Sequence, residues 1–223
     1  MSLWGPVWLT LQLAGITTVL LLLIATPIAW WLANTRARIR PAIEALTALP
    51  LVLPPTVLGF YLLILMSPES PLGGAWVRLT GEALTFSFSG LVVASIFYSL
   101  PFAVQPLQAA FQSVGKGMME AASTLGASRW DAFRSVALPL SRRGVLTAAV
   151  LSFAHTIGEF GVVLMVGGNI PGRTRVISIE IYSAVETLDY RTAHVLSGGL
   201  LVFSFVVLTI VYLMNARGVR AGV

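Results

Sequence analysis

Hydrophobic residues gather along the chain into five long runs that polar segments separate. Each run holds close to, or more than, the roughly 20 residues that a helix needs to cross the hydrocarbon core of a bilayer. The runs lack the alternation of apolar and polar positions that marks the strands of a membrane barrel. Since backbone groups in lipid must pair within the chain, the pattern predicts an all-α, polytopic membrane helix bundle. The five predicted transmembrane helices cover residues 8–33, 46–66, 87–111, 144–166 and 193–213.

Composition is typical of a membrane protein and excludes a soluble one. Hydrophobic residues make up 57% and charged residues 10% of the 223 residues, whereas soluble domains carry roughly 25% charged residues. We find no internal repeat and expect one membrane domain over residues 1–223. The first apolar run is too long for the core of a cleavable signal peptide, so none is expected. The sequence has no cysteine, which removes disulfides and thiolate metal sites from consideration.

Basic residues are shared unequally between the two sets of loops, and this predicts the orientation of the chain. Cytoplasmic loops carry the excess of Lys and Arg. A net charge of +5 would suggest a nucleic-acid partner in a soluble protein, but membrane orientation explains it here. The richer set is Arg36, Arg38, Arg40, Lys116, Arg129, Arg134, Arg142, Arg143, Arg217 and Arg220, and the poorer set is Arg78, Arg173, Arg175 and Arg191. We therefore expect the N-terminus outside and the C-terminus in the cytoplasm.

Aromatic residues near the ends of the predicted spans support this division into membrane and loops. Tryptophan is enriched at the two membrane–water interfaces, where its amphipathic ring is most stable. The tryptophans expected at the interfaces are Trp4, Trp8, Trp30, Trp31 and Trp76.

The longest cytoplasmic loop, about residues 113–142, has a pattern of its own. Residues 120–125 favour a helix, and Gly126 interrupts it with a turn that glycine makes at no steric cost. Ser128 can cap a second helix, with Asp131 three residues further on, and Pro139 should end that helix. The pattern predicts two short helices across the cytoplasmic surface. An amphipathic linker that rests on the bilayer is one interpretation of this loop.

A second interpretation comes from a resemblance to a known family. The residues Glu120, Ala121, Ala122, Gly126, Leu138 and Pro139 stand at the spacing of the EAA loop of ABC importer permeases, which the loop resembles. The resemblance implies that the two short helices are coupling helices, which dock on an ATP-binding subunit. Small Ala121 and Ala122 would then permit close approach, and Glu120 would supply a charged contact.

Three further segments narrow the resemblance. Residues 49–59 read LPLVLPPTVLG, residues 156–161 read TIGEFG, and residues 168–175 read GNIPGRTR. Together they resemble the molybdate permeases and, less closely, the sulfate permeases. The resemblance implies a permease that carries molybdate across the bacterial cytoplasmic (inner) membrane, driven by ATP hydrolysis in a partner. Sulfate and tungstate are alternatives, because these anions have the same charge and a similar tetrahedral shape.

The resemblance also implies the partners: a second permease copy, two ATP-binding cassette subunits and an extracytoplasmic molybdate-binding protein. The chain itself has no ATP site in its sequence. Gly115-Lys116-Gly117 lacks the spacing of a phosphate-binding loop, and no strand precedes it. We therefore expect a transport subunit that is not itself an enzyme and carries no cofactor, with ATP and Mg²⁺ bound by the partner ATPase.

Helix-breaking residues early in the second span suggest a translocation pathway. Pro54 and Pro55 remove helical hydrogen bonds, which is typical either of a simple kink or of a broken helix that lines the pathway. In the second case Thr56 would be a neutral donor, which binds an anion weakly enough to release it. We keep both interpretations.

The fourth span carries the acid Glu159 and, four residues earlier, His155. An ionisable group inside a span points to function, but a carboxylate repels an anion. A structural role, a gating or lining role and a protonated donor therefore stay open for Glu159. His155 is interpreted as packed or facing the pathway, and with too few further ligands no metal site is expected. Gly158 and Gly161 flank the acid.

Two arginines lie in the predicted outer loop after the fourth span. Arg173 and Arg175 are expected to contact the binding protein.

Two functions from other classes compete with the permease. An ion-coupled secondary transporter is the alternative from another class, but inverted repeats and acids on several spans would mark it. A membrane-embedded enzyme would need a cluster of nucleophiles or metal ligands, for which His155 and Glu159 are insufficient.

Overall fold

The computed structural model describes residues 4–220, together with their side chains except those of residues 116 and 214–220. Every regular element in this part of the chain is a helix, so the all-α prediction is confirmed. Three helices are long and apolar enough to cross a membrane on their own. They are α1 (Trp4–Asn34), α5 (Phe88–Ser113) and α12, which spans Tyr190–Arg220.

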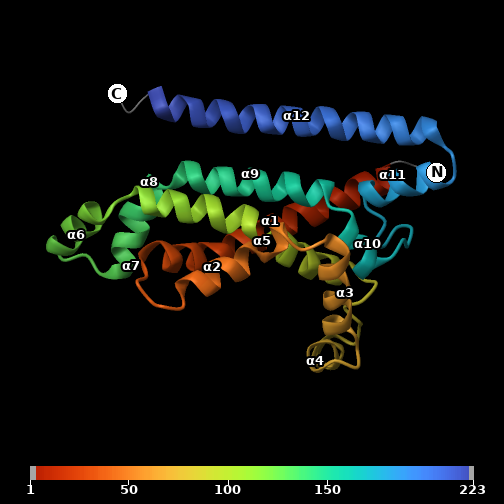
Figure 1. Cartoon of the computed structure of the whole chain (residues 1–223), viewed down its shortest axis with the longest axis horizontal. Helices are drawn as coiled ribbons and strands as arrows, with labels where there is room; N and C mark the ends of the chain where they lie inside the picture. Colours follow the sequence, from red (N-terminus) through yellow and green to blue (C-terminus); the bar gives the residue numbers. More distant parts are fainter. Residues whose placement is uncertain (1–3, 221–223) are drawn as a thin grey trace.

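The core of the molecule is formed by α1, α5 and α9 (Arg142–Gly158), which lie side by side (Figure 1). Leu21, Leu107 and Ala148, one from each helix, are fully buried in the same cluster. Gly144 allows the close approach of α9 to α5, because a Cβ at this position would lie 2.1 Å from the Cβ of Ala110. This packed trio holds the shorter helices in place.

The second predicted span is not one helix. The chain forms α2 (Arg40–Ala48) and the short helix η1 (Leu49–Leu51), then breaks and resumes as α3 (Pro55–Met66) at an angle of 108°. Pro54 has an extended ψ of 135°, which is the conformation that a residue before a proline prefers. The predicted single helix over residues 46–66 is therefore wrong, and the prolines mark a break rather than a simple kink. That the broken helix lines a pathway stays a prediction.

The fourth predicted span is also interrupted. Helix α9 ends at Gly158, Glu159 takes an extended ψ of 130°, and the seven-residue α10 follows at Gly161–Gly167. At 1.5 Å per residue, α10 is far too short to cross a bilayer. A single helix over residues 144–166 was therefore wrong. Two pairs of helices are strongly bent: Arg40–Leu51 with α3, at 108°, and Arg129–Leu140 with α9, at 70°. If each pair is counted as one span, the described residues have up to five spans.

The predicted loops contain short helices of their own. Helix α4 (Pro71–Thr80) begins at the N-cap Ser70, and α11 (Ile177–Glu186) precedes α12. The loop that the sequence places in the cytoplasm forms α6 (Lys116–Thr124), α7 (Arg129–Ala132), η2 (Phe133–Ala137) and α8 (Leu138–Leu140).

The sequence predicted that Pro139 ends the second helix of this loop, and this prediction was wrong. The helical backbone continues through Pro139 to Leu140, and η2 before it is wound as a π-helix. A proline in a regular α-helix clashes with the carbonyl four residues earlier, and π-turns relieve such conflicts inside longer helices. The bend into α9 comes only after Leu140.

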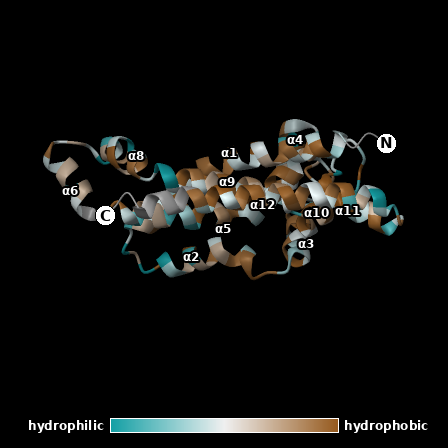
Figure 2. Cartoon of the chain, turned by 90° about the horizontal axis from the view of Figure 1, so that it is seen from above, coloured by the Kyte–Doolittle hydropathy of each residue, from teal (hydrophilic) through white to brown (hydrophobic). Residues whose placement is uncertain are grey.

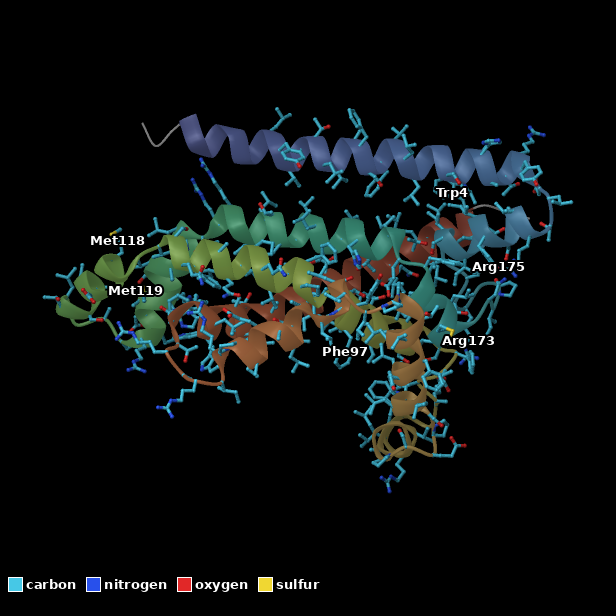
Figure 3. All side chains as sticks on the ribbon, in the orientation of Figure 1. Trp4, Phe97, Met118, Met119, Arg173 and Arg175 are labelled. Atoms are coloured by element: carbon cyan, nitrogen blue, oxygen red, sulfur yellow. The ribbon has the colours of Figure 1, made fainter. Side chains whose placement is uncertain are left out.

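The bundle is hydrophobic in its middle and more hydrophilic at its two ends. Hydrophobic residues dominate the middle of α1, α5 and α9, and hydrophilic residues gather toward both ends (Figure 2). Met118 and Met119 of α6 lie at one end, and Trp4, Arg173 and Arg175 lie at the other (Figure 3). The start of α1 and the α6–α8 loop are therefore at opposite ends. The side chains of Lys116, Arg217 and Arg220, which entered the predicted orientation, lie outside the described residues.

Candidate functional site

The loop between α5 and α9 forms the pair of short helices that the sequence predicts. Gly126 sits between α6 and α7 with a φ of +85°, in the left-handed region that glycine adopts readily. Ser128 caps α7, because its hydroxyl accepts from the N–H of Asp131 while the Asp131 carboxylate accepts from the N–H of Ser128. We call Lys116–Leu140 the coupling loop, after the role that the resemblance implies.

The predicted coupling residues are distributed over both faces of this loop. Glu120 and Ala121 are exposed on α6, whereas Ala122 is buried. Further along, Leu138 is half-buried and Pro139 is exposed. Glu120 lines an open cavity of about 650 Å³ between α6, α7 and the end of α1, with Trp30, Asn34 and Arg129 among its other lining residues.

An aromatic cluster joins the coupling loop to the core. Phe133 of η2 lies 5.0 Å, centroid to centroid, from Trp30 of α1 and 5.9 Å from Phe111 of α5, and Trp30 and Phe111 are 5.3 Å apart. Trp30 therefore packs between helices, and its place at the membrane interface stays a prediction. The sequence shows the apolar face that holds Phe133, but nothing in it pairs Phe133 with Trp30, about a hundred positions earlier.

The second group of predicted residues meets where α3, α9 and α10 approach one another. An open cavity of about 550 Å³ lies there, lined by Pro55, Thr56, Tyr98, Ala154, His155, Gly158, Glu159, Phe160 and Gly161. A Cβ on Gly161 would lie 2.7 Å from the Cβ of Pro55, so the starts of α10 and α3 are in contact. We call this the span-break cavity. Of the predicted pathway residues, only Pro54 is absent from its lining.

A chain of hydrogen bonds determines which ring nitrogen of His155 carries the proton. The hydroxyl of Thr156 donates to the carbonyl oxygen of Ser152 (2.9 Å), because a carbonyl can only accept. Ser99 must then donate its one proton to Thr156 (3.1 Å), and its oxygen accepts from Nδ1–H of His155 (2.8 Å). The proton of the neutral ring is thus on Nδ1, and Nε2 is left as an acceptor. Phe102 stacks on the imidazole at 3.9 Å.

Glu159 is the most unusual side chain of this cavity. It is 3% exposed, and neither carboxyl oxygen has a hydrogen-bond partner among the described residues. Its backbone is held, since the hydroxyl of Ser178 on α11 donates to the carbonyl oxygen of Glu159 at 2.5 Å. The sequence identified Glu159 and His155, but it gave no signal for Ser99 or Ser178, which contact them from other helices.

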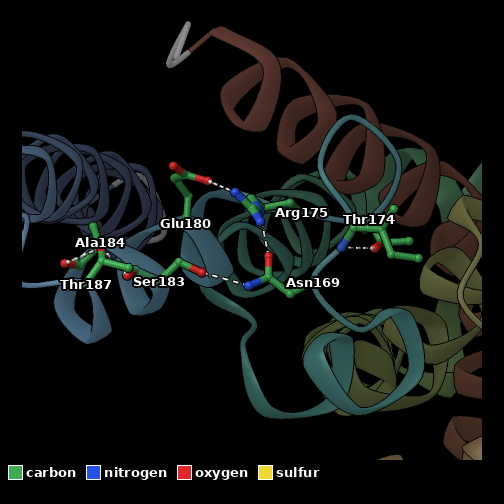
Figure 4. Close-up of polar contacts among 8 residues, drawn as sticks. Asn169, Thr174, Arg175, Glu180, Ser183, Ala184 and Thr187 are labelled. Atoms are coloured by element: carbon green, nitrogen blue, oxygen red, sulfur yellow. Dashed lines mark hydrogen bonds and ion pairs between the residues drawn. The ribbon is translucent and has the colours of Figure 1, made fainter.

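The two predicted outer arginines have different surroundings (Figure 4). The Nε of Arg175 donates to Oδ1 of Asn169 at 2.5 Å, and its guanidinium lies 3.5 Å from the Glu180 carboxylate. Asn169 in turn donates to Ser183 of α11 at 2.7 Å. Arg175 therefore fastens the α10–α11 connection to α11, whereas Arg173 is exposed.

The same end of the molecule has an open pocket of about 520 Å³, and most of the charged groups that line it are acidic. Its lining combines Arg175 with three acids, Glu180, Glu186 and Asp189. Hydrogen bonds from Thr192, followed by a smaller effect of the neighbouring Arg191, hold the pKa of Asp189 below its usual value. Asp189 is thus a charged cap at the start of α12, with its Oδ1 3.2 Å from the N–H of Thr192.

Comparison with known proteins identifies relatives over almost the whole chain. Residues 25–219 match the family described as binding-protein-dependent transport system inner membrane component. The chain is 58% identical over 214 residues to the molybdenum transport system permease protein ModB of Azotobacter vinelandii, which covers 96% of this chain and 94% of that protein. It is 34% identical over 189 residues to the sulfate transport system permease protein CysT of Escherichia coli, covering 85% of this chain and 68% of that protein.

Solved structures share the fold. A chain of a bacterial alginate ABC transporter, crystallised in complex with an alginate pentasaccharide-bound periplasmic protein, superposes with a TM-score of 0.73 at 18% sequence identity. The superposition covers 96% of this chain and 78% of the other. The arrangement of α1–α12 is therefore one that an ABC transporter chain adopts.

Proposed function

The chain belongs to the family of inner membrane components of binding-protein-dependent transport systems, and we propose that it is the permease that carries molybdate in an ABC importer. The observation that carries this proposal is the 58% identity to the Azotobacter vinelandii permease over 96% of the chain. Because the match covers 96% of the chain, it extends over both the coupling loop and the residues that line the span-break cavity.

The proposal assigns different partners to the two ends of the molecule. Two ATP-binding cassette subunits bind the coupling loops of two permease copies, with Glu120 and Ala121 exposed at the contact. An extracytoplasmic molybdate-binding protein delivers the anion to the opposite end, where Arg173 is exposed. ATP and Mg²⁺ are bound by the ATPase subunits, and the permease supplies the path.

The polar groups of the span-break cavity suit a path of low affinity. Its lining has no Lys or Arg, and its donors are neutral hydroxyls such as those of Thr56 and Tyr98. Neutral groups let an ion enter and leave, whereas a tight cationic site would retain it. High affinity for molybdate therefore resides in the binding protein.

Reconstitution tests this function directly. Proteoliposomes that contain the permease with its ATPase should accumulate labelled molybdate only when ATP is inside and the loaded binding protein is outside. Sulfate is the second candidate substrate, because the Escherichia coli sulfate permease is 34% identical over 85% of the chain. Import of sulfate but not of molybdate would show that sulfate is the substrate. Uptake that an ion gradient drives without ATP would refute the proposal of an ABC importer.

The orientation has its own test. We infer that the N-terminus faces the outside of the inner membrane and the coupling loop faces the cytoplasm. Because the chain has no cysteine, Ser2→Cys and Gly117→Cys provide single labelling sites near α1 and in α6. A membrane-impermeant maleimide added outside should label the first and spare the second, and the reverse pattern would invert the topology.

A further inference from the structure

The packing of α5 against α9 brings two unpartnered polar groups together in the core. The hydrogen bond between Ser99 and Thr156 fixes the register of these antiparallel helices. One turn further along, the same register places Ser95 of α5 beside Glu159, and the Ser95 hydroxyl lies next to the Glu159 carboxyl group. That hydroxyl and both carboxyl oxygens are buried, and none of them has a hydrogen-bond partner among the described residues. The two groups are therefore left to satisfy each other.

The other polar groups around Glu159 are already engaged. Ser178 of α11 donates its proton to the backbone carbonyl oxygen of Glu159, and the ring proton of His155 is donated to Ser99. Tyr98 and His155 are the other titratable groups that line the span-break cavity, whose lining has no Lys or Arg. The two ion pairs found among the described residues involve other side chains. Within the described part of the chain, no cation therefore offsets a charge on Glu159.

An ionised carboxylate does not fit these surroundings, whereas a neutral acid does. A carboxylate offers about four acceptor sites and no donor, and a single hydroxyl can serve only one of them. An unpaired charge in the interior is so costly that a buried group normally takes its neutral form instead. A neutral carboxylic acid has one O–H donor, which the oxygen of Ser95 can accept. The Ser95 proton can then go to the backbone carbonyl one turn earlier on α5, as the proton of Thr156 does on α9.

We propose that Glu159 is held as an uncharged carboxylic acid, and that its O–H donates to Ser95. This bond fastens the break between α9 and α10 to α5, so Glu159 is a positioning residue for one wall of the span-break cavity. The wall then carries no fixed negative charge. The consequence for transport rests on the proposed function: a divalent oxyanion in the cavity meets no carboxylate that would repel it.

Infrared difference spectroscopy of the permease–ATPase complex tests the protonation state. A neutral carboxyl group has a C=O stretching band that carboxylates lack, and exposed acids are ionised at neutral pH. The spectrum of the unmodified complex minus that of Glu159→Gln should therefore show this band at neutral pH. The matched control Glu82→Gln, at an exposed position, should leave the band in place. A difference spectrum with carboxylate bands instead would overturn the proposal.

The same spectra test the partner of the acid. Ser95→Ala removes the oxygen that accepts the Glu159 proton, so the C=O band should move to a higher frequency. This variant keeps Glu159, and it therefore carries the test on its own if Glu159→Gln does not fold. A flat difference spectrum between the unmodified complex and Ser95→Ala would show that Ser95 is not the acceptor, and the fastening role would be wrong.

Thermal unfolding of a double-mutant cycle measures the fastening itself. Ser95→Ala and Glu159→Leu each leave the other group without a partner and should lower the unfolding midpoint. The double variant removes both groups, so its loss should be clearly smaller than the sum of the two single losses. Additive losses would contradict a bond between them. Neither the spectra nor the cycle depends on the transported anion, so a failure to import molybdate would count against the proposed function alone.

Discussion

The coupling loop and the span-break cavity bring their functional residues together in opposite ways. Residues 116–140 follow one another along the chain, and most of their polar groups are exposed. The cavity draws its lining from α3, α5, α9 and α10, and its central acid is 3% exposed. Substitutions in a local, exposed loop can change function without unfolding the protein. Substitutions in a buried junction of several helices are expected to change both function and stability.

The largest effect is expected in the coupling loop. In Gly126→Val a β-branched side chain must adopt a φ of +85°, which costs about 1–2 kcal/mol or more and changes the angle between α6 and α7. Binding-protein-stimulated ATP hydrolysis should fall about tenfold, while the melting temperature of the permease should fall by only a few degrees, because 1 kcal/mol shifts the midpoint of a chain of this size by about 2–4 °C. Gly117→Ala, in α6 with open space around it, is the matched control. Full stimulation in Gly126→Val would show that the loop tolerates another turn.

The cavity should respond to a glycine substitution in the opposite manner. A methyl group in Gly161→Ala would lie 2.7 Å from the rigid ring of Pro55, so α3 and α10 must separate, and overpacking of this kind costs about 1–3 kcal/mol. Thermal unfolding in detergent should show a lower midpoint. Gly15→Ala, which meets nothing within 4 Å on α1, should have no such effect. Equal midpoints for the two variants would mean that the junction is loose.

Hydrogen bonding in the cavity should give an effect of comparable size. Ser99→Ala leaves Nδ1–H of His155 and the hydroxyl of Thr156 without their shared partner, and an unsatisfied buried donor costs about 1–3 kcal/mol. Ser99→Cys, which keeps a weak donor and acceptor of similar size, should recover part of the loss. The chemical shift of the His155 ring nitrogens measures the change directly. An unchanged Nδ1 signal in Ser99→Ala would contradict the assigned proton positions.

The cap of α7 gives the smallest expected effect. Ser128→Ala removes the hydroxyl that accepts from the N–H of Asp131, a loss of about 1 kcal/mol for a helix N-cap. Because α7 is short and exposed, the result should be faster amide hydrogen exchange in residues 129–132 with little change in global unfolding. Ser128→Asn, which can cap equally well, is the control. A large drop in the unfolding midpoint would show that the loop is less independent than its contacts suggest.

The same contrast explains what the sequence could predict. The capping box of Ser128, the turn at Gly126 and the paired short helices were predictable because each depends on residues within a few positions of one another. The three long helices followed from hydropathy alone. Pro54 and Pro55 indicated the break before α3, but a hydropathy window averages across a short break, so the interruption at Glu159 was missed.

Contacts between distant segments were not predictable from one sequence. Nothing local pairs Ser99 with His155, Ser178 with Glu159, or Phe133 with Trp30. Arg175 illustrates the same limit: its type and loop position suggested a contact with the binding protein, but nothing in the sequence pairs it with Asn169 and Glu180 of its own chain. The sequence gives the chemical groups of single residues. Whether a group is free to bind a partner or is engaged within the chain depends on the packing of distant segments.

The uneven burial of the spans also bears on how the chain is built into the bilayer. Over its most apolar stretch α12 has a mean hydropathy of 2.3, yet only 11% of that stretch is buried by the rest of the chain. Such a helix can partition from the translocon into lipid on its own hydrophobicity. The 12 residues of α3 and the seven of α10 are too short to do so, and the bends beside them expose backbone groups that lipid cannot satisfy. We therefore expect α3 and α10 to wait at the translocon until α1, α5 and α9 can receive them, so membrane insertion of the middle of the chain depends on folding while that of its last helix does not.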